Sequence, residues 1–258
     1  LQQVRDPPAR VSSEEAGGTL QDHLEELRRR IIVSAVAVAA TAAGCFFLSD
    51  WLLRIMLLPS GGLELRAFGI MDGFMIRLRL ALYAGVVVAF PVWAWQAVRF
   101  VGPGLLTGER RRMVPFLAAA LVLFAAGTVF GYYLLGLTVR VLIDLFPPRI
   151  EYLPSATDYL SFSAFFLLAC GIAFQLPCML VLLVSLRVIR AESLRRRRKA
   201  AWFVLFVFAE IVTPVADPIV APLTVLVPLV LLYEASVFIA RRVDARRDRE
   251  TPTAPPAD

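Results

Sequence analysis

Carboxylates lie beside arginine clusters at two places in this chain, where an uncharged run meets a charged one. The first is DHLEELRRR, residues 22–30, in which Glu25 and Glu26 precede three arginines and then an apolar stretch. The second is FVGPGLLTGERRR, residues 100–112, in which Glu109 precedes another arginine triplet. Arginines alone satisfy the topology of a membrane boundary, so the added carboxylates predict a site for a cationic ligand.

A structural explanation of the first cluster is also available. Glu25 with Arg29, and Glu26 with Arg30, have the i,i+4 spacing of helix-stabilising ion pairs, each contributing about 0.2–0.5 kcal/mol. A capping box at Thr19 predicts where this helix starts. Apolar residues then recur on one helical face, at Leu20, Leu24, Leu27 and Ile31. An amphipathic helix along the membrane interface is therefore expected before the first span.

The residues needed for catalysis or cofactor binding are sparse. His23 is the sole histidine and Lys199 the only lysine. The glycines of the second cluster give G-x-G-x-x-x-G, one residue too long for the dinucleotide fingerprint, and no G-K-[ST] occurs. Three cysteines lie in apolar segments without metal-ligand spacing, namely Cys45, Cys170 and Cys178. We expect no enzyme, no cofactor, no metal site and no nucleic-acid partner.

The elements that must position these residues are membrane helices. Of the 258 residues 59% are hydrophobic, and the mean hydropathy is +0.70. The apolar residues form long uncharged runs, which predicts an all-α polytopic membrane protein. Six spans are expected, at about 31–49, 80–98, 113–139, 159–186, 200–216 and 218–240. The last two are short: 17 helical residues cover only about 25 Å of a hydrocarbon core of about 30 Å.

The distribution of charge predicts the orientation and the domain limits. The N-terminal segment, the loops 99–112 and 187–199 and the C-terminal segment together hold 21 of the 27 Lys and Arg residues. The positive-inside rule therefore places both termini in the cytoplasm. We expect a disordered segment at 1–18, a single membrane domain at 19–240 and a polar cytoplasmic tail at 241–258.

Five motifs resemble those of one family. They are HLEELRRR, FVGPGLLTGERR, FGYYL, YLSF…GIAFQLP and TPVADP, spread from residue 23 to 218. Together they resemble TatC, the multispanning subunit of the twin-arginine protein translocase. The resemblance implies six helices with cytoplasmic termini in the bacterial cytoplasmic membrane. It also implies export of folded proteins that carry a twin-arginine signal peptide, driven by the proton-motive force.

The same resemblance implies residue roles. Signal-peptide binding would fall to Glu26, Arg28, Phe100, Pro103, Glu109 and Arg110, with the two glutamates meeting the twin arginines. Positions in other spans and outer turns also match, and for them packing is as good an explanation as a direct role: Pro59, Tyr132, Tyr159, Asp217 and Glu234. Gln175 stands where many members carry a glutamate. An amide cannot titrate, so hydrogen bonding to a partner helix is expected instead of proton transfer.

The implied partners are twin-arginine signal peptides, single-span subunits of the TatA and TatB kind, membrane lipid and further copies of the chain. Two other classes remain as alternatives. A small-solute secondary transporter would show inverted repeats and broken helices at a midplane site, and no repeat is visible in the sequence. A passive membrane scaffold would not depend on Glu26 or Glu109.

Overall fold

The computed structural model describes residues 14–101, 113–144, 153–186, 188–212 and 220–250, and in these ranges the chain is helical with short connections. The elements in chain order are α1 (Glu14–Phe47), α2 (Ser49–Leu57), the 3₁₀ turn η1 (Leu58–Ser60), α3 (Asp72–Val88), α4 (Phe90–Val101), α5 (Met113–Asp144), α6 (Ala156–Ala173), α7 (Leu176–Ser185), α8 (Ala191–Arg196), α9 (Arg198–Val212) and α10 (Val220–Glu250). The described residues contain no strand, only one isolated bridge between Arg66 and Ser155.

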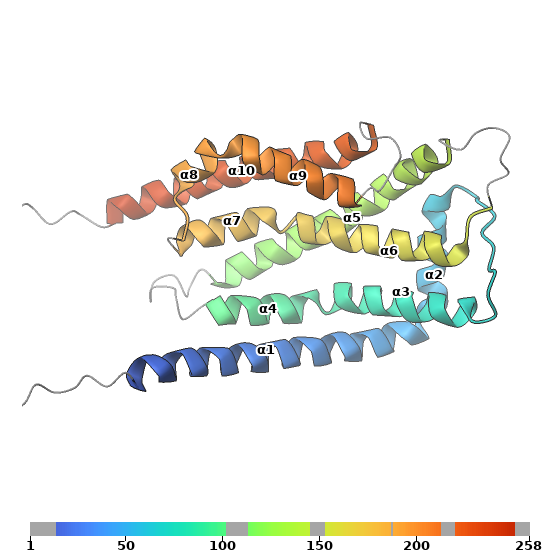
Figure 1. Cartoon of the computed structure of the whole chain (residues 1–258), viewed down its shortest axis with the longest axis horizontal. Coiled ribbons are helices and arrows are strands. Elements are labelled where there is room, and N and C mark those ends of the chain that lie inside the picture. Colours follow the sequence, from blue (N-terminus) through green and yellow to red (C-terminus); the bar gives the residue numbers. More distant parts are fainter. Residues whose placement is uncertain (1–13, 102–112, 145–152, 187, 213–219, 251–258) are drawn as a thin grey trace, which may run out of the picture.

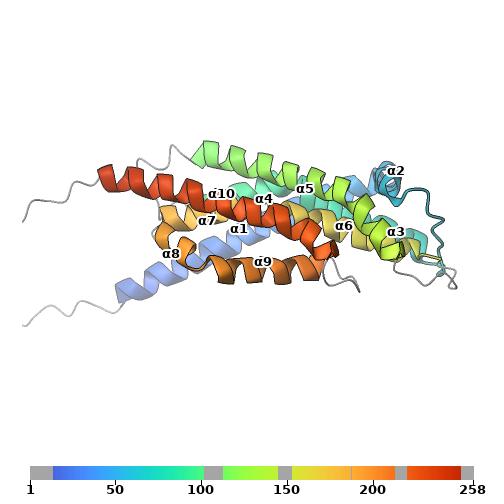
Figure 2. The same cartoon turned by 90° about the horizontal axis from the view of Figure 1, so that it is seen from above.

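The long helices run side by side along one axis, as both views show (Figures 1 and 2). The start of α1, the end of α4, the short α8 and the end of α10 share one end, which we call the arginine-rich end. Helix α2 and the start of α3 lie at the other, the distal end. Helices α9 and α10 meet well short of the distal end in both views. Helix α9, with 15 residues, is as short as expected, whereas α10, with 31 residues, is not, so the prediction that both last segments are short is wrong for α10.

Helix α1 packs against α3 through a close contact between small residues. A Cβ on Gly85 would lie 2.6 Å from the Cα of Ala42, which no side chain tolerates. The hydroxyl of Thr41 donates to the carbonyl of Gly85 over 2.8 Å. Small residues let membrane helices approach closely, because van der Waals contact rather than hydrophobic burial drives their association. This contact fixes the α1–α3 pair, and α4 continues it toward the arginine-rich end.

Two of the apolar segments are interrupted near a proline. Helices α3 and α4 are bent by 47° relative to each other. Pro91 has no N–H to continue the helical ladder, which explains a break at this place. A second break separates α6 from α7, just before Pro177. The amide of Gln175 lies at this second break, where the helix is interrupted.

The fold class is confirmed as all-α and membrane-spanning, with a difference in the number of clear spans. Within the described residues four helical segments are long and apolar enough to cross a bilayer: Gln21–Phe47, Val114–Val141, Ala156–Ser185 and Leu223–Arg242. The bent pair α3–α4 makes a fifth. Helix α9 has only 15 residues. The count of six spans therefore stays a prediction.

Several helices extend past the predicted limits. Helix α1 begins at Glu14, so that residues 14–18 are helical, and the expected interfacial helix is continuous with the first span. Acidic residues in a first turn suit the helix dipole, which explains a start before Thr19. Helix α10 likewise continues to Glu250 and includes the first ten residues of the expected tail.

The second span starts earlier than the uncharged run suggested. Helix α3 begins at Asp72 rather than at residue 80, and it includes Arg77 and Arg79. Arg77 forms an ion pair with Asp50 over 2.8 Å, and Arg79 donates to the hydroxyl of Ser161 over 3.0 Å. Partnered arginines at a helix end do not stop the helix, so reading only between charges shortened this span.

Candidate functional site

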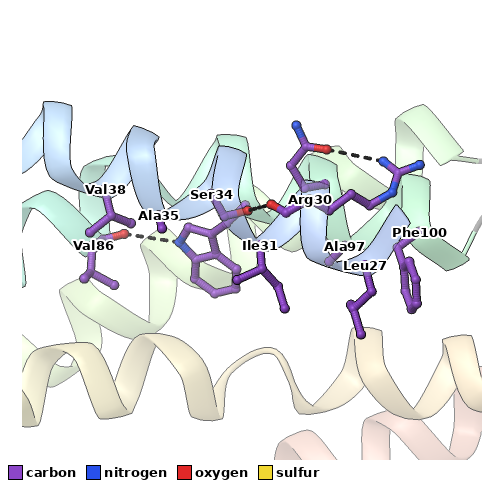
Figure 3. Close-up of a pocket in the computed structure, with 11 residues that line it drawn as sticks. Leu27, Arg30, Ile31, Ser34, Ala35, Val38, Val86, Ala97 and Phe100 are labelled. Atoms are coloured by element: carbon purple, nitrogen blue, oxygen red, sulfur yellow. Dashed lines mark hydrogen bonds between the residues drawn. The ribbon is translucent and has the colours of Figure 1, made fainter. Parts of the chain in front are cut away.

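A groove between α1 and α4 opens at the arginine-rich end. The cavity has a volume of about 570 Å³, and its walls are almost wholly apolar, including Leu27, Ile31 and Phe100. In Figure 3 these three side chains extend to one side of the helix pair, while Arg30 extends to the other. Leu27 and Ile31 belong to the predicted apolar face of the first helix. Leu24 and Ile31 of that face are 63% and 59% exposed, so the face borders the groove and is not buried against α4.

Glu26 lies beside this groove and is bound to an internal guanidinium. Its Oε1 accepts from the Nε of Arg30 over 3.1 Å, and also from Nη2 of the same side chain. The third guanidinium nitrogen, Nη1, donates to Oε1 of Gln96 over 3.3 Å. Both bonds to Glu26 use Oε1, so Oε2 retains its acceptor capacity. The side chain of Glu26 is 34% exposed, so this oxygen is within reach of a ligand.

The structure thus confirms one of the two predicted helix pairs. Glu26 and Arg30 are joined, whereas Glu25 and Arg29 are described as exposed and form no ion pair with each other. Arg28 is also exposed. The assignment of Arg28 to signal-peptide binding therefore stays a prediction.

A ring contact ties the first helix to the end of α4. His23 stacks on Phe100, with ring centroids 4.5 Å apart and an angle of 22° between the planes. Phe100 therefore lies next to the helical turn that carries Glu26, as its assignment to the site requires. The predicted site residues Pro103, Glu109 and Arg110 follow Phe100 in the chain and lie outside the described residues.

A second group of predicted residues meets at the distal end. The hydroxyl of Tyr132 donates to the carbonyl of Ile55 over 3.0 Å, and that of Tyr159 to the carbonyl of Met56 over 2.9 Å. Pro59, in η1, has no N–H to return to Ile55 four residues earlier. The carbonyl of Ile55 accepts from the backbone N–H of Leu58, and the hydroxyl of Tyr132 supplies the second donor that Pro59 cannot provide. Asp217, the remaining outer residue, lies outside the described residues.

Gln175 and Glu234 both have partners within the chain. The Nε2 of Gln175 donates to the carbonyl of Ala120 in α5 over 3.1 Å, so the expected partner helix is an internal one. Glu234 forms an ion pair with Arg198 over 2.8 Å, which links α10 to the start of α9. These contacts supply structural explanations for both residues. A role of either in binding another subunit stays a prediction.

Sequence reasoning missed Gln96, the groove residue whose amide holds Arg30, and it assigned no contact to His23, which stacks on Phe100 beside the groove. A lone amide inside an uncharged run was the available signal for Gln96, because polar residues in spans usually face another helix. His23 gave no such signal, since its partner Phe100 is 77 residues away in the sequence.

Together these features define a class: a polytopic helical membrane protein with an apolar groove that is bordered by a carboxylate and a guanidinium. The described residues contain no group of His, Cys, Asp and Glu that could hold a metal ion. The three cysteines are buried and unpaired. A partly exposed carboxylate at the end of an apolar groove suits the binding of a cationic, partly apolar chain.

Comparisons with known proteins give this class a family. The family profile of the Sec-independent protein translocase protein TatC matches residues 22–228. The TatC of Carboxydothermus hydrogenoformans is 34% identical over 230 residues, covering 86% of this chain and 93% of that protein. The TatC of Deinococcus radiodurans is 35% identical over 248 residues, covering 92% of each.

A solved structure agrees with both. A crystal structure described as the twin-arginine translocase receptor TatC in DDM has a TM-score of 0.75 and 31% identity, and the match covers 84% of this chain and 99% of that one. The chain belongs to the TatC family. It is an integral membrane protein and a subunit of a twin-arginine translocase, working with other subunits in transport rather than as an enzyme.

Proposed function

We propose that the α1–α4 groove receives a twin-arginine signal peptide, with Glu26 and Glu109 binding its two guanidinium groups. The observation that carries the proposal is the arrangement of Glu26: one carboxylate oxygen already holds a guanidinium, and the other is open beside an apolar groove. A signal peptide combines a cationic segment with an apolar stretch of 7–15 residues. The cationic segment of the peptide matches the carboxylate of Glu26, and its apolar stretch matches the apolar walls of the groove.

The size of the electrostatic contribution is consistent with recognition. Two unit charges about 4 Å apart attract by about 1 kcal/mol in water and about 4 kcal/mol at an effective dielectric of 20. Arginine adds a two-pronged fork that lysine cannot reproduce. Twin lysines in the signal should therefore bind much more weakly than twin arginines of equal charge. The difference would come from geometry and not from net charge.

The matched pair Glu26→Gln and Glu25→Gln tests this site. Both variants remove one charge from the same helical turn, but only Glu26 has a guanidinium partner in the structure. We expect Glu26→Gln to lower crosslinking of a twin-arginine precursor about tenfold or more, and Glu25→Gln to leave it nearly unchanged. Equal crosslinking in both variants would place the recognition site elsewhere.

Glu109 is tested with the double variant. If the two arginines of the signal act as a unit, Glu26→Gln combined with Glu109→Gln should cost less than the sum of the single losses. Strictly additive losses would mean that the two carboxylates bind independently. Membrane insertion of each variant serves as the control for folding.

We further propose the setting in which this site works. Both termini face the cytoplasm of a bacterium, as the 21 basic residues on their side indicate. Single-span subunits of the TatA and TatB kind, and other copies of this chain, would complete the complex, with the proton-motive force driving export. Accessibility of cysteines introduced in the segment 187–199 tests the orientation: labelling from outside the cell contradicts it.

A further inference from the structure

A second large cavity lies at the arginine-rich end, away from the α1–α4 groove. It has a volume of about 690 Å³ and is enclosed by α7, α8 and α9. Tyr233 of α10 closes its base: the ring is buried, and its hydroxyl donates to the carbonyl of Leu194 over 2.7 Å. This contact fixes α8 on α10. The cavity, which we call the α8 cavity, is therefore a built part of the fold.

The lining of the α8 cavity changes from polar to apolar along the helices. Arg190, Ser193 and Arg197 line it around α8, whereas Leu180 of α7 and Val204 of α9 line it further along. Seven helical residues separate Arg197 from Val204, which corresponds to about 10 Å. A phospholipid has the same polarity gradient along its length, with a charged phosphate at one end and acyl chains at the other.

The charge at the polar end is not neutralised by ion pairs among the residues that the structure describes. Arg198 is paired with Glu234, so it contributes little net charge. Arg190 and Arg197 have no acidic partner among the described residues. The nearby carboxylate of Asp244 accepts from the backbone N–H of Ala191 over 3.3 Å and not from either guanidinium. The polar end of the cavity therefore has two arginines available for an anion.

The cavity also opens toward the surrounding lipid. Val188 and Val204 at its edge are 66% and 64% exposed. Apolar side chains exposed on a membrane helix face acyl chains, so a lipid tail can enter from the side. The cavity between α5 and α10 has no charged residue in its lining, and in the α1–α4 groove Arg30 is already bound. Among these described cavities, the α8 cavity alone combines available cations with an apolar slot.

We infer that the α8 cavity binds an anionic phospholipid from the leaflet at the arginine-rich end. Its phosphate lies between Arg190 and Arg197, and one acyl chain lies along α7 and α9. Basic pockets between membrane helices recognise anionic headgroups in this way. The bound lipid would fill the space between α7 and α9, and it is separate from the signal-peptide groove.

Native mass spectrometry of the purified full-length protein tests the inference. Phosphatidylglycerol and phosphatidylcholine with the same acyl chains are added in turn to delipidated protein. We expect preferential retention of phosphatidylglycerol. An arginine near an anionic headgroup contributes about fivefold in affinity, so the double variant Arg190→Gln/Arg197→Gln should lose about 25-fold.

The control is the double variant Arg195→Gln/Arg196→Gln. It removes the same charge from within α8, which Arg190 and Arg197 flank, but these exposed side chains do not line the cavity. We expect it to retain phosphatidylglycerol like the unaltered protein. Equal loss in both double variants would show general surface attraction. Equal retention of the two lipids would show that the cavity does not select an anionic headgroup. Either result would overturn the inference.

The acyl slot is tested separately from the anion site. Ala201, which lines the apolar part, is replaced by Phe, and the melting temperature shows whether the variant folds. We expect Ala201→Phe to lose phosphatidylglycerol, and soluble glycerol phosphate to displace the lipid poorly. If Ala201→Phe folds and retains the lipid, or if glycerol phosphate at equal concentration displaces it, the cavity binds only a phosphate group and the lipid assignment is wrong.

Discussion

The two ends of this molecule use polar side chains in opposite ways. At the distal end, Tyr132 and Tyr159 give their hydroxyls to backbone carbonyls of α2, and both bonds join fixed partners. At the arginine-rich end, Glu26 binds Arg30 with one oxygen and leaves the other accessible. The carbonyls that accept from the two tyrosines are fixed parts of the backbone. The guanidinium of Arg30 is a side-chain group, and a guanidinium of a bound ligand can take its place on Glu26. The distal contacts thus hold the fold, and the Glu26 contact can be exchanged.

The largest expected effect comes from a change that damages both ends. Gly85→Ala places a Cβ 2.6 Å from the Cα of Ala42, so α1 must move away from α3. Overpacking of this kind costs about 1–3 kcal/mol, and it should lower both the melting temperature and precursor crosslinking. Gly44→Ala on α1 is the matched control, because nothing lies within 4 Å of its Cβ. Equal melting temperatures for the two variants would contradict the close α1–α3 contact.

Removing one tyrosine hydroxyl should affect the distal end alone. Tyr159→Phe leaves the carbonyl of Met56 without this donor in a buried position, which costs about 1–3 kcal/mol in unfolding free energy. Precursor crosslinking per folded molecule should not change. Tyr133→Phe is the control, since its ring is 79% exposed. A loss of crosslinking without a loss of stability would give Tyr159 a direct role in precursor binding. The distal end would then not serve the fold alone.

Gln175 lies between the two ends and should behave like the distal group. Gln175→Leu removes its hydrogen bond to Ala120, with an expected loss of about 1 kcal/mol in unfolding free energy and unchanged signal-peptide binding. Thermal unfolding and precursor crosslinking measure the two effects. A variant of normal stability that no longer crosslinks to a single-span subunit would instead assign Gln175 to that interface.

The smallest expected effect concerns the exchange at Glu26. Arg30→Gln removes the internal guanidinium, whose i,i+4 pair with Glu26 is worth only about 0.3–0.5 kcal/mol. A twin-arginine peptide should therefore bind about twofold more tightly, and the gain should shrink at high salt. Fluorescence titration with a labelled peptide measures the difference. Weaker binding would mean that Arg30 orients Glu26 instead of competing with the ligand.

The helices were predictable because membrane spans leave long apolar runs, but their ends were not. Arg77 and Arg79 ended a predicted span, and yet both lie inside α3, because Asp50 and Ser161 supply partners from distant parts of the chain. In the α1–α4 groove, too, the residues that depend on distant contacts were not predictable. The sequence pattern pointed to Glu26, whereas the contact of Arg30 with Gln96 depends on a helix pairing that no local pattern encodes.

The contrast between α1 and the other long segments has a mechanical consequence. Helix α1 has 34 residues without a break and is therefore about 51 Å long. Helices α3 and α4 are bent by 47° relative to each other, and two turn residues, 174 and 175, separate α6 from α7. An uninterrupted helix is stiff in compression and in bending, and a broken one yields at its joint. We therefore expect a displacement near Glu26 to be carried along α1 toward the distal end, and bending of the molecule to concentrate at the two proline breaks.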